Sequence, residues 1–587
     1  MGELGRKPLT LVEIDLPYCT RTYGSSPCTA VLGTDGAAKC FNSRATCQDP
    51  ANYEAGTKTI VFGENVDGLP KVAGLYPALA SVSTRPGDLN LSSIDPTKTA
   101  LGKRARVNIT LQDFNDADVW LDAYQAERVS GAALFSGVGY SPADNGTFLG
   151  RLVARYPYYL GLDARVRRGY FGDAISAMPV EAYVLSEWKG PNAAGVVTIT
   201  AMDVLDLADN EKAVAPAVSP GKLESAISAT ATTATLTPAG SGAGYAASGL
   251  VRIGREIMPY TISGDVLTFT KRGQEGTTAA THSALDIVQE CIVYDGWRFC
   301  DIIDDLLTTH AGINSAVVPT ADWQENYDAW VGGLVSGRVI LSKSTGVKLL
   351  VGEICQLGMM VWPDVQAQEV KFKVNAPLLP GESFYPITDA AHIIEGTVEI
   401  DRDEDQRISA MWMYHGVIDW TADLNENNFA KVTIASVDDN LYSQEAFKAV
   451  KTRWFGRTGD DAAVSVITER LLARYTDPPK VLSATLDVKD RAGIELATLV
   501  EVTSRVLQGA DGVQVAEPMQ ISYVEYAEDR LKIRAETFNI SGRFGYWLDD
   551  PTNDYGTATD EDIEFGAYWM DDTIGEFPDG TGPYVYF

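Results

Sequence analysis

Apolar and polar residues alternate with a period of two along much of the chain, a pattern that predicts half-buried β-strands. Residues 104–111 show it most clearly, since an apolar side chain stands at every second position. Residues 196–200 form another β-rich run, and residues 521–523 and 531–533 repeat the alternation. Four further residues are predicted to share one face of a strand: Ile408, Ala410, Trp412 and Tyr414. The predicted fold class is therefore mainly β with minor α.

Three segments have helical spacing instead. Residues 301–310 and 346–357 predict short helices. Residues 462–475 give the clearest pattern, and the pair Pro478–Pro479 follows as a stop signal, because proline cannot continue a helix. Helices are thus a minority among the predicted elements.

Residues 223–290 have the composition of an inserted small β-domain. A stretch rich in Ser, Ala, Thr and Gly opens it, and three predicted strands follow at 250–253, 256–261 and 266–270. Residues 240–244 are Gly-rich, but they lack the Lys-Ser/Thr ending and the strand-then-helix context of a phosphate loop, so a surface loop is predicted. The flanks of such an insert are expected to lie close together.

The end of the chain has a composition of its own. No Lys or Arg follows Arg543, and carboxylates alternate with aromatic residues over 546–587. An acidic tail is usually disordered. Aromatic side chains favour docking on an apolar surface of a partner instead, and four residues are candidate anchors: Trp547, Phe565, Tyr568 and Trp569.

Composition narrows the function classes. The chain has 587 residues, 45% of them hydrophobic, which is enough for about three or four domains. Its net charge of −31 argues against binding nucleic acid through the phosphates, which needs basic patches. The N-terminus shows no apolar signal segment, and no apolar run approaches a membrane span. We therefore expect the chain to be made and folded in a cytoplasm.

Four cysteines lie within the first fifty residues, while only three follow in the rest of the chain. Their spacing, C-x8-C-x11-C-x6-C, contains neither the tight knuckles of a zinc ribbon nor a redox C-x-x-C. The linking segments are typical of loops. A metal ion or iron–sulfur cluster, two disulfides, and free thiols all remain open for this set: Cys19, Cys28, Cys40 and Cys47.

Hydrolase motifs are absent from the sequence. The four histidines form no H-E-x-x-H, and there is no G-x-S-x-G. Carboxylates are abundant, but nothing singles out a pair suited to glycoside hydrolysis. We expect no enzymatic activity.

Several stretches resemble the tail-tip or baseplate hub proteins of long-tailed, siphovirus-type bacteriophages and gene transfer agents. The cysteine block and the inserted module, residues 250–288, carry the most specific part of this resemblance. More diffuse similarity is spread over the other stretches, namely 50–59, 106–114, 152–172, 471–479 and 487–502.

The resemblance implies a structural virion protein at the tail tip, assembled in the host cytoplasm, that takes part in viral genome ejection. Such hubs form a homotrimeric ring that closes the tail tube, with barrel-like domains that mimic tube subunits. Their partners would be the distal tail protein, the tape measure protein and the central fibre or receptor-binding protein, with DNA only in transit. Some members carry a [4Fe–4S] cluster, whose ligands here would be Cys19, Cys28, Cys40 and Cys47. Zinc or no cofactor is the alternative.

Six segments are predicted on this basis. They are a Cys-rich segment (1–60), a hub domain in two parts (61–222 and 291–400), the inserted β-domain (223–290), a second β-barrel hub domain (401–545) and the acidic aromatic tail (546–587). Two other functions stay open: a virion-associated glycan-degrading enzyme, with the insert as a carbohydrate-binding module, and a receptor-binding adhesin.

Overall fold

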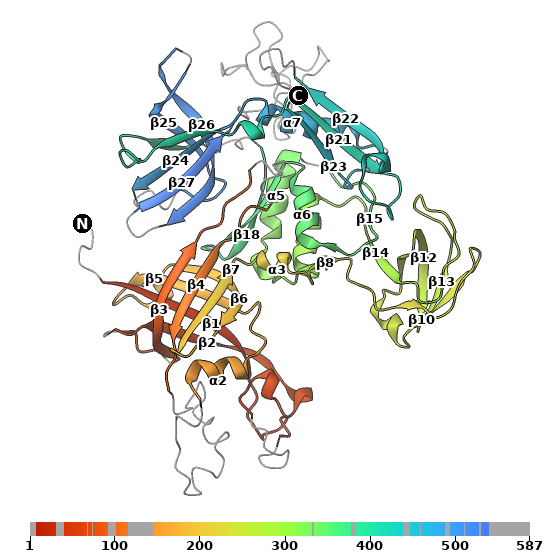
Figure 1. Cartoon of the computed structure of the whole chain (residues 1–587), viewed down its shortest axis with the longest axis horizontal. Helices are drawn as coiled ribbons and strands as arrows, with labels where there is room; N and C mark the ends of the chain where they lie inside the picture. The colour runs from red at the N-terminus through yellow and green to blue at the C-terminus, as the bar shows by residue number, and fades with distance from the viewer. Residues whose placement is uncertain are drawn as a thin grey trace, which may run out of the picture. The chain divides into compact units, whose positions relative to one another are not determined.

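The protein is known from a computed structural model, which describes most of the chain in two compact units (Figure 1). One unit comprises residues 1–86, 104–206 and 363–370, and the other comprises 87–103, 207–362 and 371–587. The described residues are 7–30, 40–66, 69–72, 74–91, 101–115, 146–331, 334–376, 383–437, 446–457, 459–487, 494–509, 511–526 and 530–538. The predicted tail, 546–587, lies outside them.

The first unit is built on a closed barrel of seven strands in the order β1-β2-β3-β4-β7-β6-β5. Strand β1 pairs antiparallel with both β2 and β5, and this double pairing closes the barrel. The predicted strand at 104–111 is confirmed as β4, with Val107, Ile109 and Leu111 fully buried. The strands are β1 (Pro8–Cys19), β2 (Ala55–Glu64), β3 (Leu75–Arg85), β4 (Arg106–Gln112), β5 (Asp163–Tyr170), β6 (Val180–Lys189) and β7 (Val196–Met202).

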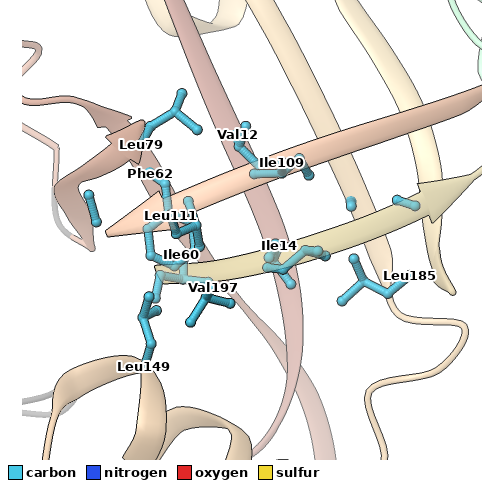
Figure 2. Packing of buried hydrophobic residues seen from close by; sticks show 14 of the residues in the cluster. Val12, Ile14, Ile60, Phe62, Leu79, Ile109, Leu111, Leu149, Leu185 and Val197 are labelled. Atoms are coloured by element: carbon cyan, nitrogen blue, oxygen red, sulfur yellow. The ribbon is translucent and has the colours of Figure 1, made fainter. Parts of the chain in front are cut away.

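Side chains fill the barrel. Val12 and Ile14 of β1 meet Ile60, Ile109 and other inward-facing residues in one buried cluster. Helix α2 (Phe148–Arg155), which the sequence patterns did not reveal, adds its buried apolar face to the same cluster. Figure 2 shows Leu149 reaching from the helix toward the strands. The barrel interior is therefore a hydrophobic core and not a channel.

Acidic side chains on the outward face of β1 form ion pairs with arginines of the neighbouring strand β5. The Arg165 guanidinium donates two hydrogen bonds of 2.7 Å to the Asp15 carboxylate and one of 2.8 Å to Glu13. Arg167 donates to the other oxygen of Glu13 at 2.7 Å. Burial would raise the pKa of Asp15, but the hydrogen bonds from Arg165 and Thr59 hold it below its usual value. These ion pairs add register specificity to the β1–β5 pairing.

In the second unit, the inserted module forms most of a seven-stranded sheet ordered β15-β14-β11-β12-β13-β10-β9. The three strands predicted in the insert are confirmed as β11, β12 and β13. The expected closeness of the two ends of the insert is also observed, because Glu290 N–H donates to the Ser219 hydroxyl at 2.9 Å. The strands are β9 (Lys222–Leu223), β10 (Thr233–Thr237), β11 (Ser248–Ile253), β12 (Glu256–Ser263), β13 (Val266–Phe269), β14 (Val288–Tyr294) and β15 (Val339–Leu341).

The Gly-rich stretch of the insert packs more closely than a surface loop. It forms a 3-10 turn, and its Gly242 is buried against the Gly264 turn. A Cβ at position 242 would stand 1.9 Å from the Gly264 carbonyl oxygen, so no other residue fits there. The Asp265 carboxylate accepts 2.7 Å hydrogen bonds from the N–H groups of Gly240 and Gly242 and locks the turn in place.

A fully buried carboxylate organises the long loop that follows β13. Glu256 accepts two 2.8 Å hydrogen bonds from the Arg272 guanidinium and one of 2.8 Å from Gly273 N–H. Ala280 N–H and the His282 ring lie at 3.0 and 2.8 Å from the same carboxylate. Burial would raise the pKa of Glu256, but these hydrogen bonds lower it to about 2. The loop is thus fixed by one charged centre.

The rest of the second unit combines helices with two further sheets. The predicted helix 301–310 is realised as α4 followed by a π-turn at Leu306–His310, and the helices predicted at 346–357 and 462–475 are α6 and α7. Helix α5 was not predicted. The helices of the chain beyond α2 are α3 (Asp206–Asp209), α4 (Phe299–Asp305), α5 (Thr320–Val331), α6 (Val347–Cys355) and α7 (Asp461–Tyr475).

Where the sequence predicts a second barrel, the described strands pair as a six-stranded sheet, β19-β25-β26-β27-β24-β20, and a three-stranded sheet, β22-β21-β23. The strands are β19 (Tyr385–Thr388), β20 (Glu399–Arg402), β21 (Ala410–Val417), β22 (Phe429–Ser436), β23 (Phe447–Lys451), β24 (Lys480–Asp487), β25 (Leu499–Gln508), β26 (Gln514–Tyr526) and β27 (Arg530–Thr537). Two two-stranded sheets also lie among the described residues. One pairs β8 (Val214–Ala215) with β16 (Thr345–Gly346), and the other pairs β17 (Met359–Asp364) with β18 (Glu369–Val374).

The strand predicted at 408–414 exists as β21, but its buried face is the other one. Met411 and Met413 are fully buried, whereas Trp412 is exposed. The reason is tertiary: helix α7 covers the methionine face, with the Thr468 hydroxyl 3.7 Å from Met413 Sδ. No helix within the described residues is long and apolar enough to cross a membrane.

The Glu256 centre gives a stability prediction. Glu256→Gln removes the charge that Arg272 requires, so we expect the insert to lose about 3 kcal/mol of stability at pH 7, as for other broken buried ion pairs. Because the folded-state pKa lies below the unfolded value of 4.5, the carboxylate stabilises the fold above pH 4.5. That contribution is lost as the pH falls through about 2, where variant and parent should converge.

The measurement is hydrogen–deuterium exchange of the amides in β11 to β13, followed by mass spectrometry. Glu275→Gln is the control, because Glu275 pairs with the partly exposed Arg338 and its loss should cost less than about 1 kcal/mol. Equal protection in the two variants at pH 7 would contradict the central role of Glu256.

Candidate functional site

Cys19 ends strand β1, and Cys28, Cys40 and Cys47 lie in the long connection between β1 and β2. Cys19 is the last residue of β1 and pairs with Ala55, the first residue of β2. Strand pairing therefore fixes both ends of the connection. Within its described part, the chain has only two short 3-10 turns, Arg44–Thr46 and Pro50–Asn52. The expectation that the segments linking the cysteines are loops is borne out for the described part of this connection.

Polar side chains hold this connection in place. Asn42 has a left-handed backbone with φ of 58° and is buried. Its carbonyl oxygen accepts a 2.7 Å hydrogen bond from Cys19 N–H, and its side-chain amide donates to Cys19 O at 3.1 Å. The Asn42 N–H also lies 3.4 Å from Cys40 Sγ. One asparagine thus ties the second half of the loop to the end of β1.

A second polar centre ties the first half of the loop to the residues after Cys47. The Asp49 carboxylate accepts hydrogen bonds from Thr29 N–H at 2.7 Å and from the Thr29 hydroxyl at 2.9 Å. The Asn52 amide donates to the same carboxylate at 3.0 Å. These hydrogen bonds, led by the one from Thr29 N–H, hold the pKa of Asp49 below its usual value. The neighbouring Arg44 donates to Pro50 O at 2.7 Å and lies 5.3 Å from the centre of the Tyr53 ring.

The structure brings all four predicted cysteines to one small cavity. Its volume is about 20 Å³, the space of roughly one water molecule, and all four line it. Cys19 is buried and the other three are half-buried. None forms a disulfide in the structure. The lining residues are Cys19, Arg21, Tyr23, Cys28, Ala30, Cys40, Asn42, Ser43, Cys47, Gln48, Asp49, Asn52 and Tyr53.

The electrostatics of the cavity favour the protonated form of the Cys47 thiol. Burial raises the pKa of Cys47, and the nearby Cys19 and Cys28 raise it further. Burial also raises the pKa of Tyr53, with added contributions from Cys19 and Cys47. Because a thiolate is the form that binds metals and attacks electrophiles, Cys47 is a poor nucleophile at neutral pH.

The prediction of an iron–sulfur centre on these four cysteines is wrong for the structure as described. No three His, Cys, Asp or Glu side chains among the described residues stand close enough together to hold a metal ion, the four cysteines included. The sequence suggested loops that need an inorganic core. The physical reason for the error is that Asn42 and Asp49 already supply that cross-linking through hydrogen bonds, and Cys19, Cys28, Cys40 and Cys47 pack around a water-sized space.

The other three cysteines belong to the second unit and are buried. Burial raises the pKa of Cys291 and of Cys300 to about 12. Cys291 pairs with Leu250 across strands β14 and β11, and Cys355 ends helix α6. They behave as small apolar core residues.

A larger cavity of about 670 Å³ opens beside helices α4 and α5. Three carboxylates line it, but each is engaged: Asp301 accepts from the Gln324 amide at 2.7 Å, and Asp304 from the Thr320 hydroxyl at 2.9 Å. Asp305 accepts from the Tyr294 hydroxyl at 2.7 Å. These bonds join α4 to α5 and β14, so we interpret the carboxylates as structural.

Comparison with known proteins gives structural similarities only. No family model matches the chain, and no curated protein matches it. Among solved structures, a tail protein from Neisseria meningitidis MC58 is 9% identical, with 78% of this chain and 96% of that chain covered at a TM-score of 0.34. The 43 kDa tail protein of prophage MuSo2 from Shewanella oneidensis is 10% identical, with 78% and 98% covered at a TM-score of 0.35.

A chain of a native gene transfer agent virion is also similar, with 14% identity, 34% of this chain and 42% of that chain covered, and a TM-score of 0.24. These similar structures are described as two tail proteins and a gene transfer agent virion. These TM-scores are all below 0.5, so we base none of the functional conclusions on them.

The state of the four cysteines can be measured. Protein purified without oxygen should be colourless and should contain no stoichiometric iron or acid-labile sulfide. After denaturation, all seven cysteines should react with a thiol reagent, because all are free in the structure. Fewer than seven reactive thiols would indicate disulfides, and a bound metal that protects these four would contradict the present description.

The role of Asp49 can be tested through the thiols themselves. Asp49→Ala removes the hydrogen bonds to Thr29 and Asn52, so the loop should open more often and Cys28 and Cys47 should react with iodoacetamide several-fold faster. Mass spectrometry of each peptide gives the rates. The control is Asp173→Ala, which removes a similar turn contact to Tyr170 N–H at the end of β5. Unchanged rates in Asp49→Ala would show that the carboxylate does not hold the loop closed.

Proposed function

We propose that the chain is a structural subunit of a phage-type tail tip, a baseplate hub that closes the tail tube and links it to a central fibre. The observation that carries the proposal is the closed barrel of the first unit. The sequence resemblance implies barrel-like domains that mimic tube subunits. A closed barrel leaves no free strand edge, so such a subunit can stand in a ring without edge-to-edge aggregation.

The filled barrel bears on where DNA would pass. Because apolar side chains occupy the interior of the barrel, a DNA channel has to lie between subunits, in the lumen of a ring. We propose a homotrimer for this ring, which closes by rotation. The net charge of −31 supports passage over retention, because negatively charged walls repel the phosphates of DNA.

The finer assignments are proposals of the same kind. The ring would contact the distal tail protein and the tape measure protein, with the central fibre or receptor-binding protein below. The six predicted segments would divide the work, with residues 223–290 as a separate module on the outer surface. Cys19, Cys28, Cys40 and Cys47 would act jointly as a reduced packing group that keeps the β1–β2 connection compact at the end of the barrel.

A glycan-degrading enzyme or an adhesin is the competing class. The cavity beside α4 and α5 is the observation closest to an enzymatic site, since it is open and lined by carboxylates. The hydrogen bonds to Asp301, Asp304 and Asp305 favour the structural interpretation. Clearing of cell-wall or capsule material in a zymogram, abolished by Asp304→Asn, would favour the enzyme instead.

The hub proposal predicts the mass of the assembled protein and its location in the particle. Light scattering of the purified chain should give three times the 63.4 kDa of the monomer, because the ring is a trimer. In particles from cells that produce the chain, gold-labelled antibody against the insert should decorate one end of the tail only. Antibody saturated with purified chain is the control.

A chain that stays monomeric at all concentrations would contradict a ring that forms without other proteins. If the trimer forms only on other tail proteins, the antibody would still label one end of the tail. Label along the tube, on the capsid or nowhere would contradict the tail-tip assignment.

A further inference from the structure

The three-stranded sheet of the second unit has an outward face that is apolar and uncovered in the described structure. Its strands align Trp412 with Ile434 and Ala449, so these side chains point the same way. Val432 stands opposite Tyr414 on the same face, and Phe447 opposite Ala410. We call this set the outer sheet face: Ala410, Trp412, Tyr414, Ala430, Val432, Ile434, Ser436, Phe447, Ala449 and Lys451.

Exposure of this face is unusual for side chains of this size. Trp412 is 36% exposed, Phe447 51% and Ile434 55%. Trp412 and Phe447 meet edge to face, with ring centres 5.1 Å apart, so they form one aromatic surface. A contiguous exposed apolar patch of this kind marks an interaction site.

Helix α7 packs against the opposite face of the same sheet, where Met411 and Met413 are buried. Lys431 points to that side, where its ammonium lies 2.6 Å from the Asp461 carboxylate. The sheet therefore packs one face against α7 and leaves its other, apolar face exposed in the described structure.

The charge of the outer sheet face indicates which kind of segment could bind to it. It carries no carboxylate, in a chain with 79 Asp and Glu. Its charged member is Lys451, whose ammonium lies 3.4 Å from Glu426. An acidic segment of a chain with a net charge of −31 meets no like charge from the residues of this face.

The chain itself ends in such a segment. Residues 544–587 contain 11 carboxylates, no Lys or Arg, and aromatic residues spaced along their length. These aromatics are typical interface anchors, and Trp412 with Phe447 offers them a matching surface.

The starting point of that segment also fits. At Phe538, the backbone N–H donates to Pro518 O at 2.8 Å, and the ring lies 5.1 Å from the guanidinium of Arg474. Arg474 belongs to α7, the helix that covers the inner face of the sheet. An extended chain gains roughly 3.3 Å per residue, so the 44 residues of the segment can pass round an edge of the sheet. Tethering within the same chain raises the effective concentration of the segment at the face.

We propose that residues 544–587 dock on the outer sheet face of their own chain, with aromatic side chains covering Trp412, Ile434 and Phe447. This inference does not depend on the proposed role at a tail tip. It concerns an intramolecular contact that the purified chain makes by itself.

Photo-cross-linking in the full-length chain tests the contact. p-Benzoylphenylalanine in place of Val432 should cross-link to peptides from residues 544–587 when irradiated. The same amino acid in place of Val266 is the matched control, because Val266 is a strand valine of a different sheet with 43% exposure against 42% for Val432. Position 266 should give no cross-links to the tail.

Mixing ¹⁴N- and ¹⁵N-labelled chains decides which copy supplies the tail. Cross-links within one isotope support the proposal. Links to the tail of another copy, links to residues 410–451 of another copy, or no links at all would each overturn it, the second in favour of a self-associating face.

A charge variant provides an independent measurement. Ile434→Glu, added to the chain that carries the cross-linker at position 432, should lower the tail cross-link yield about tenfold through repulsion of the acidic tail. Ile287→Glu is the control, with 57% exposure against 55% for Ile434, and should leave the yield unchanged. Because both side chains are exposed, we expect neither substitution to change the melting temperature. An unchanged melting temperature then verifies that each variant is folded. An equal yield in the two variants would overturn the docking.

Discussion

Closure of the first unit depends on one strand that pairs on both sides. Residues 8–14 of β1 pair with β5, and residues 11–19 pair with β2, so the central part of the strand is hydrogen-bonded to both neighbours. This requires two different faces on β1. Val12, Ile14 and Leu16 point into the core, while Glu13 and Asp15 form ion pairs outside. A one-residue slip would exchange these faces, so the charges disfavour any other register.

The cysteine connection inherits its position from this strand. Because Cys19 ends β1 and Ala55 begins β2, the loop between them starts and ends at adjacent points of the barrel wall. The remaining order comes from polar side chains, with Asn42 at one turn and Asp49 at another. A loop too short of apolar residues to build a core can still be ordered when a few side chains satisfy many backbone groups. Four thiols around a water-sized space complete that packing.

Charged and polar side chains also order the loops of the inserted module. Its sheet buries an apolar cluster, yet the long loop beyond β13 is fixed by the single carboxylate of Glu256. Asp265 does the same for the Gly-rich turn. In both places a charge that accepts several N–H groups takes the role that apolar packing plays elsewhere. At Glu256, which is fully buried, the cost of burying the charge makes its partners indispensable.

The sequence by itself determined the elements whose signal is local. Alternation predicted β4, and helical spacing with a proline stop predicted α7. The insert strands followed from their turns. Proximity of the four cysteines could be expected from their crowding, but their state could not, because ligand geometry depends on where a loop places each sulfur. Asn42 and Asp49 gave no signal beyond being turn-forming residues.

Tertiary packing decided the rest. The strand at 410–417 has apolar residues on both faces, so the pattern alone could not tell which face is buried, and α7 made the choice by covering Met411 and Met413. The closure of the barrel was decided in the same way, since pairing β1 with β5 joins residues about 150 positions apart. Local propensity carries no information about such partners, because the free energy that selects them arises only when both surfaces are buried together.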